Sequence, residues 1–390
     1  MANIQIIDKG TKNERYKVMY DVTPGPLQKR KRRAKTFPVG TPLKEVKRFL
    51  RDVETEKDKG IYVDYSKRTL DAFAEEYFEQ YGEFISPTTL ENYKQMYYTK
   101  KNGIKKYLGN IKLENLDTSD VQAYVKVLMD DGRSPKTIKN RIMFLHAMLE
   151  KAMKLNYIRR GYNPAEGCDL PKVVTKQVDV YTVDEVRQLL AAANLQSNLN
   201  IKLIINLLVG SGIRKSELCS LKHDSFDFTN GTVKIDTARV SAQGKIYLKE
   251  TKSQSGTRTI PLPISVTELV KQSIADYKKR KLKYGSDFID SSYLLTTKYG
   301  KPLTPDGVYN LYRNFMTKQP ELRYLPMHKI RHTYASIAIA NNADIKTVQE
   351  LLGHASASVT LNVYSHAYHS KKREQADKLD DMLFSNCIMA

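Results

Sequence analysis

The stretch from Pro326 to His366 constrains this chain more than any other, because it sets imidazoles beside a guanidinium in a helical pattern. Five of the seven histidines in the 390-residue chain lie at or after His328. His328 and Arg331 are three positions apart in a segment with helical periodicity, so both side chains belong to one helix face. The pairing indicates a site for an anion.

A second helix is predicted directly after this one. Residues 344–352 carry an apolar stripe at helical spacing, and Gly353 supplies a typical stop. His354 follows the glycine at once, and Tyr364 comes ten positions later. Two imidazoles, a guanidinium and a phenol could therefore meet around one phosphate group.

The order of these residues resembles the catalytic end of the tyrosine recombinases, the phage integrase family. In that family an H-x-x-R motif, here HKIR, precedes an L-G-H motif, and a tyrosine follows, here in NVYSH. Upstream, RKSEL supplies Arg214 where the family has an arginine. The segment LKETKSQSGTRTIPLP supplies Lys252 where the family has a hairpin lysine. The resemblance covers residues 181–364.

The resemblance implies attack by the Tyr364 hydroxyl on a DNA phosphodiester, which leaves a 3′-phosphotyrosine and a free 5′-hydroxyl. Arg214 and Arg331 are expected to hold the non-bridging oxygens, because guanidiniums bind such oxygens in bidentate fashion and keep their charge.

The remaining roles follow from the same resemblance. His328 is expected to accept the phenol proton, and His354 to hydrogen-bond the phosphate. Lys252 is expected to protonate the leaving 5′ oxygen, although a solvated turn lysine is the alternative. His332 and Tyr368 are nearby alternatives that fit the motif spacing less well.

The composition agrees with a phosphate-bearing partner, since the formal net charge is +21. A basic but otherwise ordinary enzyme is the alternative. No apolar run reaches the roughly 18 residues of a spanning helix, and residues 201–209 are predicted to form a buried helix. The three cysteines are far apart, and the N-terminus has no signal pattern. We therefore expect a reducing, intracellular compartment, with no role for a membrane.

Residues 1–66 are predicted to form a small domain of three strands followed by a helix. Its basic run comprises Lys29, Arg30, Lys31, Arg32 and Arg33. The unit resembles the arm-type DNA-binding domain of lambda-type and conjugative-transposon integrases, with this run following the phosphates. A solvated loop is the alternative reading of the run.

Residues 67–162 are predicted to be helical. Residues 69–81 are amphipathic, Ser86-Pro87 opens a second helix, Thr118 or Asp117 caps a third, and Ser134-Pro135 opens a fourth. Lys136 and Lys139 lie off the apolar stripe of the last helix, as DNA-contacting residues would. The domain resembles the core-binding domain of the family, and an ordinary four-helix domain with solubilising lysines is the alternative. A linker is expected over residues 163–177.

Residues 178–390 are predicted to form the catalytic domain with a C-terminal tail. A capping box from Thr182 to Glu185 marks its first helix, and a small antiparallel sheet is expected over residues 232–261. Glu217 is expected to brace Arg214 or to cap locally. The tail is expected to dock on a neighbouring protomer, with an intramolecular helix as the alternative.

The predicted fold is therefore multidomain and mainly α, with small antiparallel β-sheets. The predicted function is that of a site-specific recombinase of a phage or conjugative transposon, which acts as a homotetramer on double-stranded DNA through a Holliday junction. An accessory DNA-bending or excision factor and a nucleoid location in a bacterial cytoplasm are implied. No nucleotide-binding loop or metal-ligand motif occurs, so no cofactor is expected. A type IB topoisomerase and a non-catalytic DNA-binding regulator are the alternatives.

Overall fold

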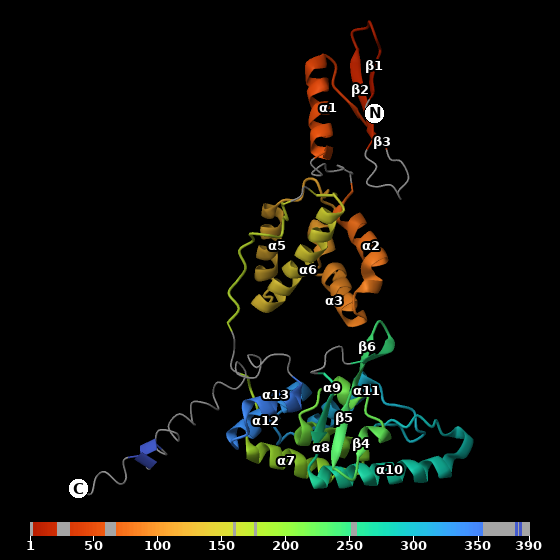
Figure 1. The fold of residues 1–390 in the computed structure, drawn as a ribbon, viewed down its shortest axis with the longest axis vertical. Helices are drawn as coiled ribbons and strands as arrows, with labels where there is room; N and C mark the ends of the chain where they lie inside the picture. The colour runs from red at the N-terminus through yellow and green to blue at the C-terminus, as the bar shows by residue number, and fades with distance from the viewer. Residues whose placement is uncertain are drawn as a thin grey trace, which may run out of the picture. The chain divides into compact units, whose positions relative to one another are not determined.

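The computed structural model describes residues 3–21, 32–58, 68–158, 161–174, 178–250, 256–353, 379–380 and 382–383. The chain divides into two compact units, residues 1–174 and 175–390 (Figure 1). Both consist mainly of helices with small antiparallel sheets, which confirms the predicted fold class. Six predicted site residues lie outside the described residues: Lys29, Arg30, Lys31, Lys252, His354 and Tyr364.

The first unit begins with a three-stranded antiparallel sheet and a helix. The sheet has the order β1-β2-β3, and its elements are β1 (Asn3–Ile7), β2 (Arg15–Asp21), β3 (Arg32–Thr36) and the following helix α1 (Leu43–Asp58). Val18 of β2 and Val46 of α1 are fully buried against Phe37. Because strand side chains alternate between faces, Arg15 and Lys17 lie on the sheet face opposite α1.

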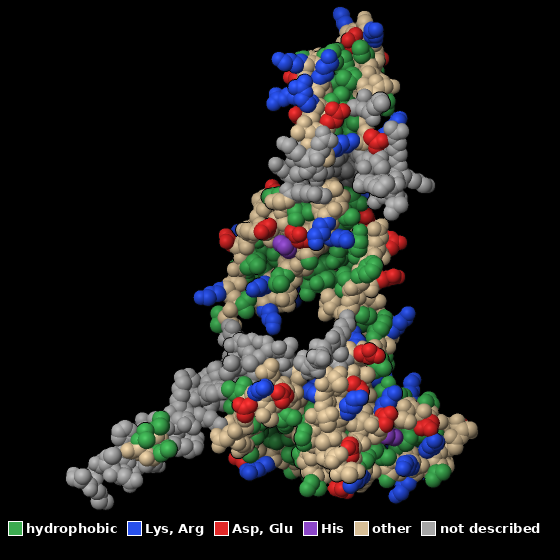
Figure 2. Space-filling view, in the orientation of Figure 1, with side chains coloured by type: hydrophobic (Ala, Val, Ile, Leu, Met, Phe, Trp, Pro, Cys, Tyr) green, Lys and Arg blue, Asp and Glu red, His purple; other side chains and the backbone are tan. Residues whose placement is uncertain are grey.

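The exposed side of α1 carries four basic residues among several acidic ones. Figure 2 shows Lys and Arg side chains gathered along this helix. The exposed basic residues are Lys44, Lys47, Arg48 and Arg51. Basic side chains therefore lie on two surfaces of this element, the open face of the sheet and the exposed side of the helix.

The rest of the first unit is helical and has its own core. Its helices are α2 (Leu70–Tyr81), α3 (Pro87–Tyr98), α4 (Ile104–Leu108), α5 (Thr118–Asp130) and α6 (Pro135–Lys154), with the short 3-10 helix η1 (Gly82–Phe84). The four long helices begin where the sequence predicts, because their N-cap side chains accept hydrogen bonds from the first turn. The short helix α4 was not predicted, since five residues carry no periodic pattern.

The second unit is built around one buried helix, α8 (Leu199–Ser211). Residues 201–209, predicted to be a buried helix, lie within it, and it packs against helices on several sides. The neighbouring helices are α7 (Val183–Asn194), α10 (Ile264–Tyr284), α11 (Pro305–Thr317) and α12 (Met327–Ala340). Thr182 and Glu185 form the predicted capping box at the start of α7.

Short strands and helices complete this unit. They are α9 (Lys215–Leu218), α13 (Ile345–Leu352), the three-stranded sheet β4 (Phe226–Asp227), β5 (Thr232–Ile235) and β8 (Arg258–Pro261), the hairpin β6 (Thr237–Ala242) and β7 (Lys245–Glu250), and the 3-10 helices η2 (His223–Ser225) and η3 (Gly285–Asp287). In Figure 1, α12 and α13 lie side by side. Among the described residues, no helix combines the length and apolarity needed to cross a membrane.

Candidate active site

Arg214 is positioned by the way the central helix α8 ends. Gly212 caps that helix in the left-handed conformation, with φ of 61°. A β-carbon at this position would lie 2.6 Å from Cδ1 of Tyr334 and 2.9 Å from Cδ2 of Leu352. Only glycine therefore lets α12 and α13 approach the helix end so closely. The chain then turns through the buried Ile213 and presents Arg214 at the start of α9.

Arg331 reaches the same place from the middle of α12. Only 2% of the residue is exposed, and it ranks first by size among the fully buried side chains of the described residues. Its Nη1 donates to the carbonyl of Gly212 at 2.9 Å, and its Nη2 donates to the carbonyl of Leu352. A buried guanidinium thus joins the C-terminal ends of α8 and α13.

Three successive carbonyls at the end of α13 each accept from a different arginine. Nε of Arg258 lies 2.6 Å from the oxygen of Leu351. Arg331 binds Leu352, and Nη2 of Arg214 lies 3.1 Å from the oxygen of Gly353. The last carbonyls of a helix have no partner within it and form the negative end of its dipole, so cations stabilise this terminus. The terminus leads directly into His354.

Glu217 holds two of these arginines together. Its carboxylate accepts from Nη1 of Arg214 at 2.6 Å and from Nη2 of Arg258 at 2.8 Å. It also accepts from the backbone N–H of Arg214 at 2.8 Å. Burial raises the pKa of Glu217, but the hydrogen bonds and charges of the two arginines outweigh this effect and leave the pKa below its usual range. Glu217 is therefore a buried, ionised brace.

His328 lies in the first turn of α12 and remains exposed to solvent, with partial shielding of its ring by neighbouring groups. Loss of solvation lowers the pKa of His328 below its usual value, and the nearby charges of Arg331 and Arg214 lower it further. Its ring packs edge-on against that of His332, with centroids 4.6 Å apart. The imidazole is consequently neutral near pH 7 and able to accept a proton.

The structure thus brings Arg214 to His328 and Arg331, which lie close to each other in the sequence but far from Arg214. Lys252 follows β7 and precedes Gly256 in the chain, and His354 follows Gly353, but neither lies among the described residues. In the part of the chain that the structure describes, no group of three or more His, Cys, Asp or Glu side chains could hold a metal ion.

The four described residues predicted to contact DNA lie in the first unit. Arg32 and Arg33 begin strand β3, where they pair with Asp21 and Tyr20. Lys136 and Lys139 are exposed near the start of α6. Exposure makes Lys136 and Lys139 accessible to a DNA phosphate.

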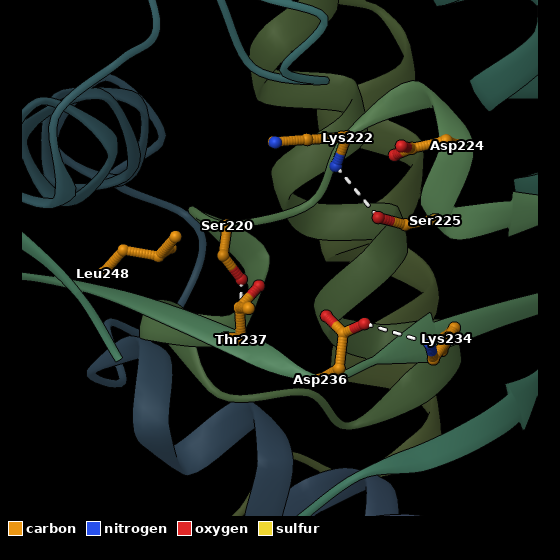
Figure 3. A pocket seen from close by; sticks show the side chains of 8 residues that line it. All are labelled: Ser220, Lys222, Asp224, Ser225, Lys234, Asp236, Thr237 and Leu248. Carbon is orange, nitrogen blue, oxygen red and sulfur yellow. Dashed lines mark hydrogen bonds and ion pairs between the residues drawn. The ribbon is translucent and has the colours of Figure 1, made fainter. Parts of the chain in front are cut away.

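A separate pocket of about 290 Å³ lies beside α9 and the strands β5 and β6 (Figure 3). Ser220 donates to the carbonyl of Thr237 across it at 2.7 Å. Its charged lining consists of Lys222, Lys234, Asp224 and Asp236, which balance one another. None of the predicted catalytic residues lines this pocket, and its balanced charge does not suit a phosphate.

Arg214, Arg258 and Arg331 form an arginine cluster at the end of α13. Of these three, Arg258 was not among the predicted site residues. It stands in the quoted segment TKSQSGTRTIPLP, six positions after Lys252. Its side chain is only 7% exposed and pairs with Glu217. An arginine at the start of an apolar strand segment was the available signal, because buried arginines require a partner.

Comparison with known proteins identifies the class of enzyme. The chain is 26% identical over 343 residues to a XerC-like tyrosine recombinase of Caldanaerobacter subterraneus subsp. tengcongensis. The alignment covers 83% of this chain and 85% of the relative. It is 27% identical to the tyrosine recombinase XerD of Staphylococcus haemolyticus, over 78% of this chain and 97% of the relative. The protein is a tyrosine recombinase.

Solved structures share the fold. The integrase of transposon Tn1549, in complex with a circular intermediate DNA, aligns with a TM-score of 0.66 and 23% identity over 80% of this chain and 99% of its own. A lambda integrase dimer bound to a COC′ core site aligns with a TM-score of 0.56 and 18% identity over 93% of this chain and 94% of its own.

The family follows from two sequence patterns. The phage integrase family pattern matches residues 179–371, and the pattern of the phage integrase N-terminal SAM-like domain matches residues 69–129. Together they account for well over half of the chain. The chain belongs to the phage integrase family, as the motifs around Arg214, His328 and Arg331 predict.

Proposed function

We propose that this tyrosine recombinase is the integrase of a mobile element, which integrates and excises DNA through a 3′-phosphotyrosine on Tyr364 and a Holliday junction. One observation carries the proposal. Arg214 and Arg331, from distant parts of the chain, both bind the segment that ends at Gly353, and His328 lies close enough for both charges to lower its pKa. His354 and Tyr364 continue from that segment.

The first half of the reaction is a transesterification. The Tyr364 oxygen forms a bond to phosphorus while the bond from phosphorus to the 5′ oxygen breaks. The phenol proton passes to His328, whose lowered pKa keeps it neutral and ready to accept. Arg214 and Arg331 stabilise the charge that grows on the non-bridging oxygens, and His354 donates a further hydrogen bond.

The leaving 5′ oxygen takes a proton from Lys252. Lys252 belongs to the segment between β7 and β8, and β8 begins with Arg258, which donates to Glu217 beside Arg214. Rejoining reverses these steps with a different 5′-hydroxyl. Because the phosphotyrosine retains the energy of the phosphodiester, we expect the reaction to need no nucleotide.

DNA is the proposed substrate and partner of both units. The first unit would bind arm-type sites through its small sheet and the run from Lys29 to Arg33. The helices α2 to α6 would hold the core site, with Lys136 and Lys139 on phosphates. The net charge of +21 supports these contacts, as does the similarity in fold to a lambda integrase over 93% of this chain.

The assembly and location are part of the same proposal. Four protomers would act together on the DNA, with the C-terminal tail of each docked on a neighbour, and an accessory DNA-bending or excision factor would direct the reaction. Such an enzyme would work in the cytoplasm of a bacterial host, on the nucleoid.

The test is covalent capture of DNA. A duplex from the sequence flanking the gene, nicked beside the cleavage position, should trap the wild-type enzyme as a detergent-resistant adduct. Tyr364→Phe should bind this duplex with unchanged affinity and form no adduct, whereas the matched variant Tyr368→Phe should form it normally. A normal adduct yield with Tyr364→Phe would refute the assignment.

A further inference from the structure

Arg258 joins three parts of the second unit at one buried point. Its Nη1 and Nη2 lie 3.2 Å and 2.8 Å from the two carboxylate oxygens of Glu217 on α9. Its Nε lies 2.6 Å from the carbonyl oxygen of Leu351 on α13. The side chain itself belongs to the first residue of β8, the strand that follows the Lys252 segment. Arg258 therefore ties β8 to α9 and to the end of α13.

The charges around Glu217 require such a partner. Glu217 is 3% exposed and contacts Arg214 through a hydrogen bond of 2.6 Å. A buried carboxylate this close cancels most of the field of a single guanidinium at a neighbouring phosphate. With Arg258 on its other side, the carboxylate is already compensated. The trio of two arginines and one glutamate then keeps one net positive charge.

We propose that Arg258 is a positioning residue for strand cleavage, which offsets Glu217 so that Arg214 keeps an uncancelled positive charge for the scissile phosphate. Through Leu351 it also fixes the end of α13, from which the chain runs into His354. The inference rests on the proposed function, because it assigns Arg258 to the same phosphate site.

The test compares variants of Arg258 on two substrates. Arg258→Gln removes the charge, and Arg258→Lys keeps it. Arg239→Gln is the matched control, since Arg239 is also buried and donates to backbone carbonyls, those of Cys219 and Leu303, without contacting Glu217. Single-turnover cleavage is measured on a nicked duplex and on the same duplex with a neutral methylphosphonate at the scissile position. Melting temperature and DNA affinity are measured for each variant.

Arg258→Gln should cleave the phosphodiester about 10- to 100-fold more slowly, a smaller loss than the roughly 10²- to 10³-fold expected when a donor to the developing charge is itself removed. Its defect should shrink at least several-fold on the methylphosphonate, because that substrate needs less positive charge. Arg258→Lys should recover most of the rate. Arg239→Gln should lower the melting temperature while leaving the ratio of rates on the two substrates unchanged.

Other results would overturn the inference. Wild-type cleavage by Arg258→Gln, an equal defect on both substrates, or Arg258→Lys as slow as Arg258→Gln would each exclude charge compensation. If Arg258→Gln does not fold, the double variant Glu217→Gln with Arg258→Gln replaces it, since this pair leaves no buried unpaired charge. Its ratio of rates on the two substrates should match that of the wild type, because a neutral side chain at position 217 no longer opposes the charge of Arg214, and a lower ratio of phosphodiester to methylphosphonate cleavage would contradict the proposal. Failure of the wild-type enzyme to form any adduct would instead refute the proposed function.

Discussion

Nη2 of Arg214 lies 3.1 Å from the carbonyl oxygen of Gly353, which comes 139 positions later in the chain. This hydrogen bond connects the residue after the central helix to the segment that leads into His354. Arg331 binds the preceding carbonyl, so the two arginines meet at one helix terminus. Residues separated by most of the second unit therefore form one site.

The two arginines should differ in what their loss does to stability. Arg331→Met leaves the buried carbonyls of Gly212 and Leu352 without their donor, and an unsatisfied buried acceptor costs about 1–3 kcal/mol. Arg214→Met affects a side chain that is 38% exposed, so the expected loss is about 1 kcal/mol or less. Chemical denaturation measures both values, and equal losses would contradict this difference in burial.

Both substitutions should nevertheless slow cleavage to a similar degree. Removal of one preorganised donor from a developing negative charge typically costs about 10²- to 10³-fold in rate. Single-turnover adduct formation, measured at saturating enzyme, separates this loss from any change in affinity. An Arg214→Met enzyme with a wild-type rate would remove Arg214 from the site.

The pH dependence of cleavage should report His328. Its pKa is lowered by loss of solvation and by Arg331 and Arg214, so the imidazole stays neutral as the pH falls past about 6.5, the ordinary value for histidine. The cleavage rate should therefore hold from pH 8 to about 6.5 and fall only at lower pH. His328→Asn should be slow and lack this acid limb, whereas His332→Asn should retain it.

The same shift affects stability in a defined direction. The unfolded chain binds a proton at His328 more readily than the folded protein does. The contribution of His328 to the free energy of unfolding is therefore fully present above about pH 6.5. It is lost as the pH falls through the lower pKa of the folded state. His328→Asn should thus reduce the decline in unfolding free energy below that pH, and an unchanged decline would place the titration elsewhere.

Gly212 should tolerate no side chain. Gly212→Ala imposes both a left-handed backbone, at about 1–2 kcal/mol, and a clash with Tyr334 and Leu352, at about 1–3 kcal/mol. Gly231→Ala is the matched control, because Gly231 has φ of 62° with no atom within 4 Å of an added β-carbon. Thermal and chemical unfolding should show the larger loss for Gly212→Ala, and equal losses would argue against close packing there.

The first residues of the chain should contribute to the salt dependence of DNA binding. Deletion of residues 1–66 should weaken binding to one class of site and flatten the plot of log affinity against log salt, by about 0.9 for each DNA phosphate that these residues neutralise. An unchanged slope would exclude an arm-binding role for this segment.

Paired substitutions can show which surface of this segment contacts the DNA. Arg15→Ala with Lys17→Ala alters the open face of the sheet, and Lys47→Ala with Arg51→Ala alters the exposed side of α1. If the sheet lies on DNA, only the first pair should flatten the slope, by about 1–2. The reverse result would place the DNA against the helix.

Much of the fold could be predicted from local patterns. Helix starts at Ser86, Asp117, Ser134 and Thr182 follow from capping side chains, and α8 follows from its apolar run. Such signals act within one turn of helix, so they are visible in sequence. The short α4 has no cap of this kind and no periodicity, which explains why it was missed.

Only those site residues that belong to a family motif could be predicted from the sequence. Arg214, His328 and Arg331 came from the family resemblance, and their convergence depends on long-range packing that spacing does not encode. Arg258 was missed because its partners, Glu217 and Leu351, are distant in sequence. A buried ion pair becomes visible only when both elements are placed in space.

The most direct test of this account is to find which residue the DNA joins. The trapped adduct should be digested with nuclease and protease, and the peptide that carries the remaining nucleotide sequenced by mass spectrometry. The account predicts a 3′-phosphoryl nucleotide on the oxygen of Tyr364. Attachment to Tyr368 or to any other residue would contradict it.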